Sequence, residues 1–293
     1  MEANKNDKTT KQDNSIFRKR IPMGAFFLFA GLFIWFVFSR NVDKGIITTF
    51  VLNPGGAQVL LPDIRFDTLT ALNIISITCI SLGIIQILKG FGKFVNYALF
   101  LVGILVTIGF LAWGAENTSI NIGGMLRVMI LRSVPITLGA LAAILCERSG
   151  VVNIAVEGMM ITGALVAAIA GSAYGLWIGM LAAVLAGGLT AVVHAILSIK
   201  YKINQVISGT IINITTIGLT SYIVTKLLQN SGLQHLNNSG FFQPIQLPLL
   251  SQIPFFGPIL FSHNIYIYFM YILVILLTVI LFYTKWGLRL RAV

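Results

Sequence analysis

Residues 146–163 read Cys-Glu-Arg-Ser-Gly-Val-Val-Asn-Ile-Ala-Val-Glu-Gly-Met-Met-Ile-Thr-Gly and lie between two long apolar runs. The polar and small residues 147–150 predict a tight turn at a membrane surface. Glu157 then falls about two turns into the following apolar run. A carboxylate at membrane depth is a candidate functional residue, because burying its charge is unfavourable. We therefore predict Asn153 and Glu157 as buried polar or gating residues, with Arg127 or Arg132 as possible ion-pair partners for Glu157 at a different depth.

The composition indicates an integral membrane protein. The 293 residues are 57% hydrophobic and 10% charged, with a mean hydropathy of +0.90, whereas a soluble domain carries about 25% charged residues. In lipid, only helices and closed barrels satisfy the backbone. The apolar runs are continuous rather than alternating, which favours helices. The predicted fold class is all-α, a polytopic transmembrane helix bundle.

Eight apolar runs each approach the roughly 20 residues that cross a bilayer. They cover residues 21–39, 68–88, 94–115, 124–146, 151–171, 176–199, 203–227 and 265–283. Residues 1–20 are rich in Lys, Asn and Thr, which predicts a disordered cytoplasmic tail. Residues 21–293 then form one transmembrane domain.

The net charge of +11 indicates topology rather than a nucleic-acid partner. Most Lys and Arg residues fall in the N-terminal tail and in alternate loops. Only Arg40, Lys44 and Arg65 fall in the loops of the other side. Basic loops stay on the cytoplasmic side of a membrane. We therefore predict a cytoplasmic N-terminus, and the 147–150 turn then lies at the inner surface.

Small residues recur at four-residue spacing along the fifth and sixth runs. They are Gly163, Ala167, Gly171 and Gly175, then Gly179, Ala183, Gly187, Ala191 and Ala195. Such spacing lets two helix backbones approach closely in lipid. We favour plain helix packing over a gate as its meaning.

The seventh run is unusually polar for a membrane span. Asn204, Ser208 and Thr216 share one helical face, and Gln205 and Asn213 lie on the adjacent face. We predict that Asn204, Ser208, Asn213 and Thr216 line a translocation path. Interhelical hydrogen bonding is an equally good interpretation of the same residues.

Catalytic motifs are scarce. The Ser208-Gly209 pair lacks the Gly two positions before Ser that an intramembrane serine protease carries, and no Walker A sequence occurs. Cys79 and Cys146 have neither a disulfide framework nor metal-ligand spacing. We expect no metal, no cofactor and no enzyme activity in this chain.

Four stretches together suggest a family. Residues 135–143 read Pro-Ile-Thr-Leu-Gly-Ala-Leu-Ala-Ala, and residues 147–160 read Glu-Arg-Ser-Gly-Val-Val-Asn-Ile-Ala-Val-Glu-Gly-Met-Met. Residues 204–213 read Asn-Gln-Val-Ile-Ser-Gly-Thr-Ile-Ile-Asn, and residues 286–293 read Trp-Gly-Leu-Arg-Leu-Arg-Ala-Val. Together they resemble permease subunits of ABC importers for nucleosides and simple sugars, of the branched-chain amino acid/ribose type. Residues before about 120 match in hydropathy alone.

The resemblance implies a multi-pass permease in the plasma membrane of a prokaryote, with nucleosides as first and sugars as second choice of substrate. It implies a homo- or heteromeric permease dimer, two ABC ATPase subunits that bind ATP and Mg²⁺, and an extracellular substrate-binding protein. Trp286, Gly287, Arg289 and Arg291 resemble the start of the loop that contacts the ATPase. In the family that loop continues into further spans, so we expect a chain that is incomplete at its C-terminus.

Two other classes of protein stay open. A secondary, proton-coupled transporter would use Glu157 as its proton carrier. An intramembrane enzyme would need a nucleophile and base, or a metal set, that the sequence does not display.

Overall fold

Eight helices of the computed structural model are long and apolar enough to cross a membrane, which confirms the predicted all-α, eight-span architecture. The structure describes residues 20–56, 60–229 and 232–291. The predicted disordered tail, residues 1–20, lies outside the described residues except for Arg20. Seven of the helices begin within about three residues of their predicted spans, and the fifth begins later than predicted.

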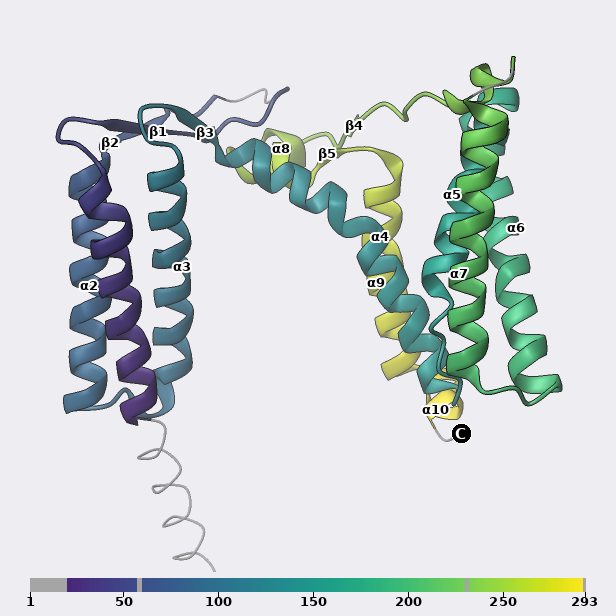
Figure 1. Cartoon of the computed structure of the whole chain (residues 1–293), viewed down its shortest axis with the longest axis horizontal. Helices are drawn as coiled ribbons and strands as arrows, with labels where there is room; N and C mark the ends of the chain where they lie inside the picture. Colours follow the sequence, from purple (N-terminus) through teal and green to yellow (C-terminus); the bar gives the residue numbers. More distant parts are fainter. Residues whose placement is uncertain (1–19, 57–59, 230–231, 292–293) are drawn as a thin grey trace, which may run out of the picture. The chain divides into compact units, whose positions relative to one another are not determined.

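The chain divides into two compact units, Met1–Met125 and Leu126–Val293. The first unit contains three long helices, with two short strands between the first and second helices and a third strand after the third helix (Figure 1). Its elements are the first span (Arg20–Asn41), β1 (Ile47–Val51), β2 (Ile64–Asp67), α2 (Thr68–Leu88), η3 (Gly92–Phe94), α3 (Val95–Gly114) and β3 (Ser119–Asn121). The first span ends in a π-helical turn, η1 (Ile34–Phe38), and a 3-10 turn, η2 (Ser39–Asn41).

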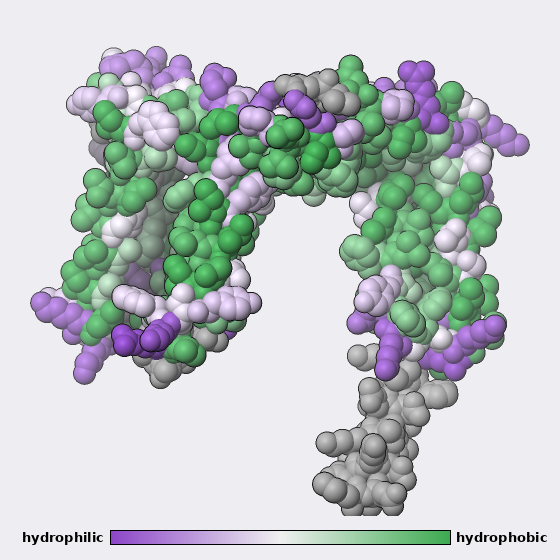
Figure 2. All heavy atoms as spheres, turned by 180° about the vertical axis from the view of Figure 1, so that it is seen from behind, coloured by the Kyte–Doolittle hydropathy of each residue, from purple (hydrophilic) through white to green (hydrophobic). Residues whose placement is uncertain are grey.

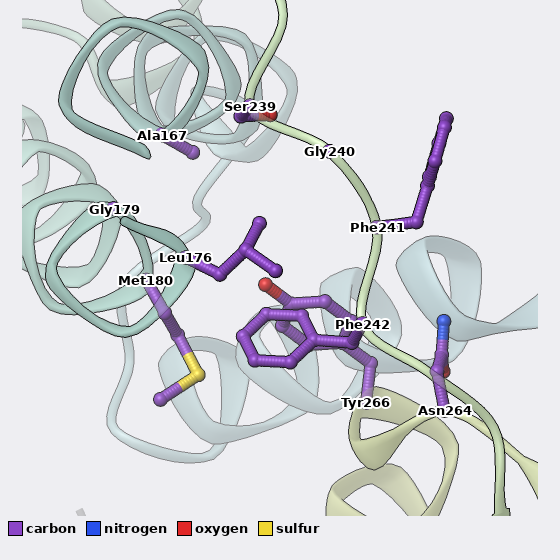
Figure 3. Close-up of a pocket in the computed structure, with 10 residues that line it drawn as sticks. All are labelled: Ala167, Leu176, Gly179, Met180, Ser239, Gly240, Phe241, Phe242, Asn264 and Tyr266. Atoms are coloured by element: carbon purple, nitrogen blue, oxygen red, sulfur yellow. The ribbon is translucent and has the colours of Figure 1, made fainter. Parts of the chain in front are cut away.

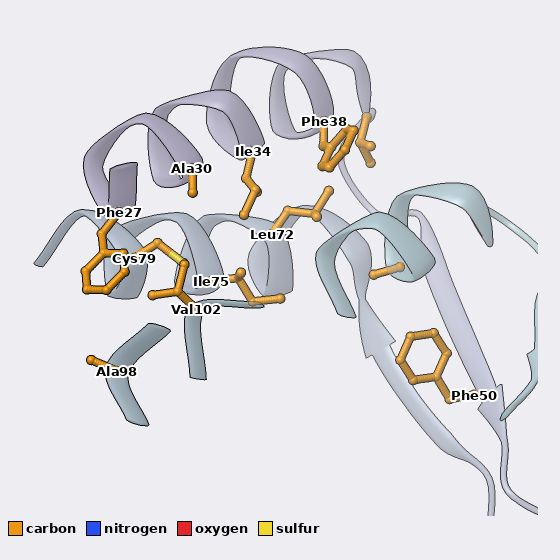
Figure 4. Packing of buried hydrophobic residues seen from close by; sticks show 12 residues of the cluster. Phe27, Ala30, Ile34, Phe38, Phe50, Leu72, Ile75, Cys79, Ala98 and Val102 are labelled. Atoms are coloured by element: carbon orange, nitrogen blue, oxygen red, sulfur yellow. The ribbon is translucent and has the colours of Figure 1, made fainter. Parts of the chain in front are cut away.

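The three long helices of this unit enclose one apolar core. Phe27 and Ile34 of the first span, Leu72 of α2 and Val102 of α3 are fully buried (Figure 4). The first span and α2 also approach closely, because the Ser76 hydroxyl donates a hydrogen bond of 2.8 Å to the Gly31 carbonyl. The unit is therefore held by packing and by hydrogen bonds between helices.

A three-stranded sheet covers one end of these helices. β1 lies in the middle, antiparallel to β2 and parallel to β3. The Thr48 hydroxyl on β1 lies 2.7 Å from the Thr68 hydroxyl and donates to the Ala112 carbonyl at 3.0 Å. Because Thr68 begins α2 and Ala112 lies near the end of α3, one buried threonine fixes the sheet to both helices.

The second unit contains the remaining helices. Its elements are α4 (Ile122–Arg148, begun in the first unit), α5 (Val156–Tyr174), α6 (Leu176–Ala195), η4 (Ile196–Lys200), α7 (Gln205–Ile223), η5 (Val224–Leu228), η6 (Gln234–Asn237), β4 (Ile245–Gln246), η7 (Leu250–Gln252), α8 (Phe256–Leu260), β5 (Ser262–His263), α9 (Ile265–Tyr283) and α10 (Lys285–Arg291). In both units, hydrophobic side chains cover the flanks of the long helices and hydrophilic ones gather at their ends (Figure 2).

Helices α5 and α6 pack through their small residues, as predicted. A Cβ at Gly179 would lie 2.7 Å from the Cα atom of Gly171, and a Cβ at Gly163 would lie 3.3 Å from the Ala183 carbonyl oxygen. No side chain larger than hydrogen fits between Gly171 and Gly179. The two helices therefore form one closely packed pair.

Polar contacts anchor the loop before α9. The Arg127 guanidinium of α4 donates to the Ser262 carbonyl at 2.9 Å, and the Tyr268 hydroxyl donates to the Ile245 carbonyl at 2.7 Å. His263 is buried and its Nε2 lies 2.6 Å from the Ile259 carbonyl. Burial lowers the pKa of the His263 imidazole below its ordinary range, the Arg127 cation lowers it further, and the Ile259 hydrogen bond opposes both.

We predict that Gly31→Ala destabilises the first unit. The new Cβ would lie 2.9 Å from both the Ile80 nitrogen and the Ser76 carbonyl oxygen, so the two helices must separate. Overpacking of this kind costs about 1–3 kcal/mol. Unfolding of the detergent-solubilised protein measures the effect. Gly103→Ala in α3 is the control, because a Cβ there meets nothing within 4 Å, and equal stability of the two variants would contradict the prediction.

We also predict a stability change that depends on His263 and on pH. Because the folded chain favours the neutral imidazole, the unfolded chain takes up a proton first as the pH falls. The stabilisation is complete above the unfolded pKa of about 6.5 and is lost as the pH falls through the lower folded pKa. Melting temperatures between pH 8 and pH 5 should therefore fall less in His263→Gln than in the parent. His235→Gln, at an exposed histidine, should keep the parent slope, and an unchanged slope in His263→Gln would refute the assignment.

Candidate functional site

The Glu-Arg-Ser-Gly turn is a specific C-terminal cap of helix α4. The Val151 N–H donates to the Cys146 carbonyl at 3.0 Å, and the Gly150 N–H donates to the Glu147 carbonyl at 3.1 Å. This pair of bonds is the Schellman arrangement, which needs a left-handed residue after the helix. Gly150 supplies it with φ of +79°. The turn therefore supplies hydrogen-bond donors to two carbonyls at the end of α4, which lipid cannot do.

Helix α5 begins at Val156, so Glu157 lies in its first turn and is exposed. The expected depth of two helical turns does not hold because α5 begins later than predicted, and the role of Glu157 as a buried polar or gating residue stays a prediction. Val151 and Val152 extend the apolar run without being helical, and that hid the break. A carboxylate in a first turn is favourably placed, because the helix dipole is positive there.

Glu157 and the arginines of α4 are far apart along their helices. Arg127 binds the Ser262 carbonyl, and Arg132 is exposed on α4. Arg132 lies 16 residues before the end of α4, or about 24 Å along a straight helix. Glu157 lies just beyond that end, so the distance along α4 is too long for an ion pair between Glu157 and Arg132.

Asn153 is half-buried in the break between α4 and α5. Its Oδ1 accepts a hydrogen bond of 3.0 Å from the Ala155 N–H, and its Nδ2 lies 3.7 Å from the Cys146 and Met159 sulfurs. Asn153 therefore shapes the break as a turn residue. A gating role for Asn153 and Glu157 stays a prediction.

Two amides of α7 close this break. The Asn213 Nδ2 donates to the Ile154 carbonyl at 2.9 Å, and the Asn213 Oδ1 accepts from the Gly158 N–H at 2.8 Å. The Gln205 Oε1 accepts from the Val152 N–H at 2.7 Å. Backbone groups outside a helix need such partners in lipid. We call these two side chains the amide clamp, and Gln205 is the member that sequence reasoning did not choose.

The other predicted path residues also contact protein groups. Asn204 caps α7 by accepting from the Val206 N–H at 2.9 Å. Thr216 donates within its own helix to Ile212, and a Cβ at Gly158 would lie 2.7 Å from its hydroxyl. These contacts fix α7 against α5. A path-lining role for Asn204, Ser208, Asn213 and Thr216 stays a prediction.

Ser208 and His194 form a buried pair between α7 and α6. The Ser208 hydroxyl lies 3.2 Å from His194 Nδ1, and the residues are only 2% and 3% exposed. The His194 Nε2 has no hydrogen-bond partner in the described part of the chain. A hydrolase would orient that nitrogen with a third group and open the serine to substrate. The pair therefore fits a structural contact between helices.

Helix α10 turns sharply away from α9. The Thr284 hydroxyl donates to the Ile280 carbonyl at 2.6 Å and accepts from the Gly287 N–H at 3.2 Å. Gly287 is buried against the Leu281 carbonyl. Trp286, 73% exposed, and Arg289 face outward. The Arg291 side chain lies outside the described residues, and its predicted contact with an ATPase, like that of Trp286, Gly287 and Arg289, stays a prediction.

Comparison with known proteins decides the family. The family described as branched-chain amino acid transport system / permease component matches residues 125–293. The chain belongs to this permease family. The match nearly coincides with the second unit, Leu126–Val293, and includes the capped turn and the amide clamp. With its eight apolar helices, this member of the family is a multi-pass membrane protein. Its predicted orientation in the membrane stays a prediction.

Several relatives carry transport names. The guanosine ABC transporter permease protein NupQ of Bacillus subtilis is 36% identical over 175 residues, 56% of this chain and 53% of that protein. The nucleoside ABC transporter permease protein NupC of Lactococcus lactis is 30% identical over 173 residues, 56% of this chain and 54% of that protein. A candidate glucose ABC transporter permease, TsgC13 of Haloferax volcanii, is 32% identical over 177 residues, 58% of this chain and 51% of that protein.

The chain spans about half the length of the curated relatives it matches. No solved structure matches it. In the described residues, no group of three or more His, Cys, Asp or Glu side chains could hold a metal ion. Cys79 and Cys146 are free.

We predict that Asn213→Leu opens the break between α4 and α5. It leaves the buried Gly158 N–H and the more exposed Ile154 carbonyl without partners, and an unpaired buried group costs about 1–3 kcal/mol. Unfolding in detergent, together with proteolysis at residues 149–155, should report the loss. Thr210→Val is the matched control, since Thr210 is exposed and bonds only its own helix at Val206. If both variants resist protease like the parent, the clamp does not hold the break.

Proposed function

We propose that the chain is the permease subunit of an ABC importer and carries nucleosides, with simple sugars as the second candidate. The supporting observation is the capped turn closed by the amide clamp, because both motifs lie inside the family match. Relatives named for guanosine and nucleosides favour nucleosides. The relative named for glucose supports the second candidate.

The proposed assembly places this chain in the plasma membrane of a prokaryote. A second permease subunit, identical or different, completes the path, two ATPase subunits bind ATP and Mg²⁺ on the inner side, and an extracellular binding protein delivers substrate. In the predicted orientation the 147–150 turn and α10 both lie on the inner side. ATP hydrolysis then belongs to partner chains, and this chain is a transport subunit without enzyme activity of its own.

Helix α10 supplies the proposed ATPase contact. Trp286 and Leu288 are 73% and 61% exposed, and Arg289 is exposed beside them. An aromatic ring next to a guanidinium is the composition enriched in the centre of protein interfaces. Thr284 and Gly287 hold this short helix against the end of α9. A displacement of α10 by the ATPase would therefore be transmitted to the transmembrane helix α9.

Helix α7 supplies the proposed wall of the path. Its packed face carries Ser208, Asn213 and Thr216, and Asn204 sets its first turn. Three further hydroxyl residues of α7, Thr210, Thr215 and Ser221, are exposed in this single chain. We propose that the residues of the packed face, together with Asn204, both position α7 and border the path, and that the exposed hydroxyls add contacts to a polar substrate in the assembled importer.

The proton-coupled alternative rests on Glu157. In the first turn of α5 an acidic side chain lies near the positive end of the helix dipole, which is a common structural position. That placement already accounts for Glu157, so the geometry gives a proton carrier no separate support.

Transport by the complete importer tests the proposal. The chain, its ATPase, its second permease and its binding protein are reconstituted in liposomes, and uptake of labelled guanosine is measured. We expect uptake that needs ATP, survives an uncoupler and resists excess glucose. Uptake that an uncoupler abolishes and that an inactive ATPase leaves intact would establish a secondary transporter. Efficient competition by glucose would move the substrate to sugars.

Variants of α10 test the coupling within the same assay. We expect Trp286→Ala and Arg289→Glu to lower uptake by about tenfold or more and to release the ATPase on purification, because interface anchors dominate binding. Tyr174→Leu is the control, because Tyr174 is as exposed as Trp286, at 73%, at the far end of α5. Normal ATPase retention by both α10 variants would contradict the assignment.

A further inference from the structure

A small cavity lies where helices α5 and α6 meet the loop that leads to α9. Its volume is about 140 Å³, close to the roughly 150 Å³ of an engineered cavity that holds benzene. Its walls include Leu176 and Met180 of α6, Ser239 and Phe242 of the loop, and Asn264 and Tyr266 at the start of α9 (Figure 3). The space therefore suits a small planar ring system.

Aromatic rings build one wall of this cavity. The Phe242 ring lies 5.2 Å from Trp177 and 5.3 Å from Tyr266, with interplanar angles of 77° and 89°. Each ring supports the next in an edge-to-face contact. Phe241, the neighbour in sequence, points away from the other lining side chains (Figure 3). Phe242 and Tyr266 thus form the wall, and Trp177, which does not line the cavity, packs against Phe242.

A buried amide supplies the polar group. The Asn264 Oδ1 is buried and has no hydrogen-bond partner among the residues that the structure describes. Asn264 occupies the N-cap position of α9, yet its side chain makes no capping bond. Asparagine normally uses that oxygen to cap a helix. Protein atoms cover this oxygen in the structure, and a rotation of the Asn264 side chain, which lines the cavity, would present it to an N–H donor of a ligand.

The lining also limits the charge and polarity of a ligand. None of its ten residues is charged, so an anion or cation would lose its hydration without a partner. A sugar would bury several hydroxyls against few polar side chains. A planar ring that offers an N–H group stacks on aromatic walls and pairs with the amide, as nucleobases do on protein surfaces.

We propose that this cavity is a binding site for the base of a nucleoside, with the sugar left at its mouth. The inference rests on the proposed function, which in its predicted orientation turns this end of α5 and α6 to the outside, where substrate arrives. The site lies toward the opposite end of α5 from the capped turn, because its lining residue Ala167 is about 17 Å along the helix from Val156. It gives this chain a recognition element for the base that is separate from α7.

Ligand-observed NMR on the purified full chain in lipid nanodiscs tests the site. The probes are uridine, adenosine, adenine, ribose and glucose. We expect saturation transfer to the base protons of uridine and adenosine and weaker transfer to their ribose protons. Adenine should displace both nucleosides, whereas ribose and glucose should displace neither. Equal transfer to base and ribose protons, or displacement by ribose or glucose, would overturn the proposal.

Variants locate the binding. Asn264→Leu and Tyr266→Leu should each weaken uridine binding by about tenfold or more, as loss of stacking or of a buried pair does. Tyr266→Phe keeps the ring and should bind within about twofold of the parent, as should Tyr283→Leu, at an exposed tyrosine outside the lining. If Asn264→Leu and Tyr266→Leu bind like the parent, the site is wrong. If either variant unfolds, the site is tested by two other results: the relative saturation transfer to base and ribose protons in the parent, and the affinity of Tyr266→Phe for uridine.

Uptake by the complete importer separates the two proposals. If ATP-driven guanosine uptake is unchanged in Asn264→Leu, the cavity site is contradicted and the importer proposal stands. If bases bind in nanodiscs but the complex shows no ATP-driven uptake in liposomes, the importer proposal is contradicted and the cavity site stands.

Discussion

A backbone that leaves a helix inside or beside lipid must find partners for its N–H and C=O groups, and this constraint shapes the second unit. Between Arg148 and Val156 the chain is not helical. The Schellman cap at Gly150 satisfies the end of α4, and the amide clamp of Asn213 and Gln205 satisfies the segment that follows. Polar residues in an apolar helix are thus explained by a break in another helix.

Composition was enough to predict the spans, because a continuous apolar run in a membrane chain has one stable backbone. The error came at the fifth span, where Val151 and Val152 look like helix but lie in the break. Gly150 and Asn153 could have indicated the later start, since both residue types favour turns. Glu157 would then have been placed in a first turn, where a carboxylate is common.

The partners of α7 could not be predicted in the same way. Periodicity places Ser208, Asn213 and Gln205 on a polar side of the helix, yet it cannot tell a water-filled path from a neighbouring backbone. The pairs that decide the matter, such as Asn213 with Ile154, join residues 59 positions apart. The aromatic cavity is harder still, because Trp177, Phe242 and Tyr266 come from three segments without a shared motif.

The two ends of helix α5 make different contacts, with α7 at its start and with α6 at its end. At its start the amide clamp ties α5 to α7, and at its end Gly171 lies against Gly179 of α6 so closely that no side chain could enter. A closely packed pair of this kind moves as a body, because its contacts cannot stretch without opening voids. A displacement at the start of α5 therefore shifts α5 and α6 together and changes the cavity that they line. Binding and release of a base there would then depend on the position of the start of α5, which makes this helix the shortest physical link between the two faces of this unit.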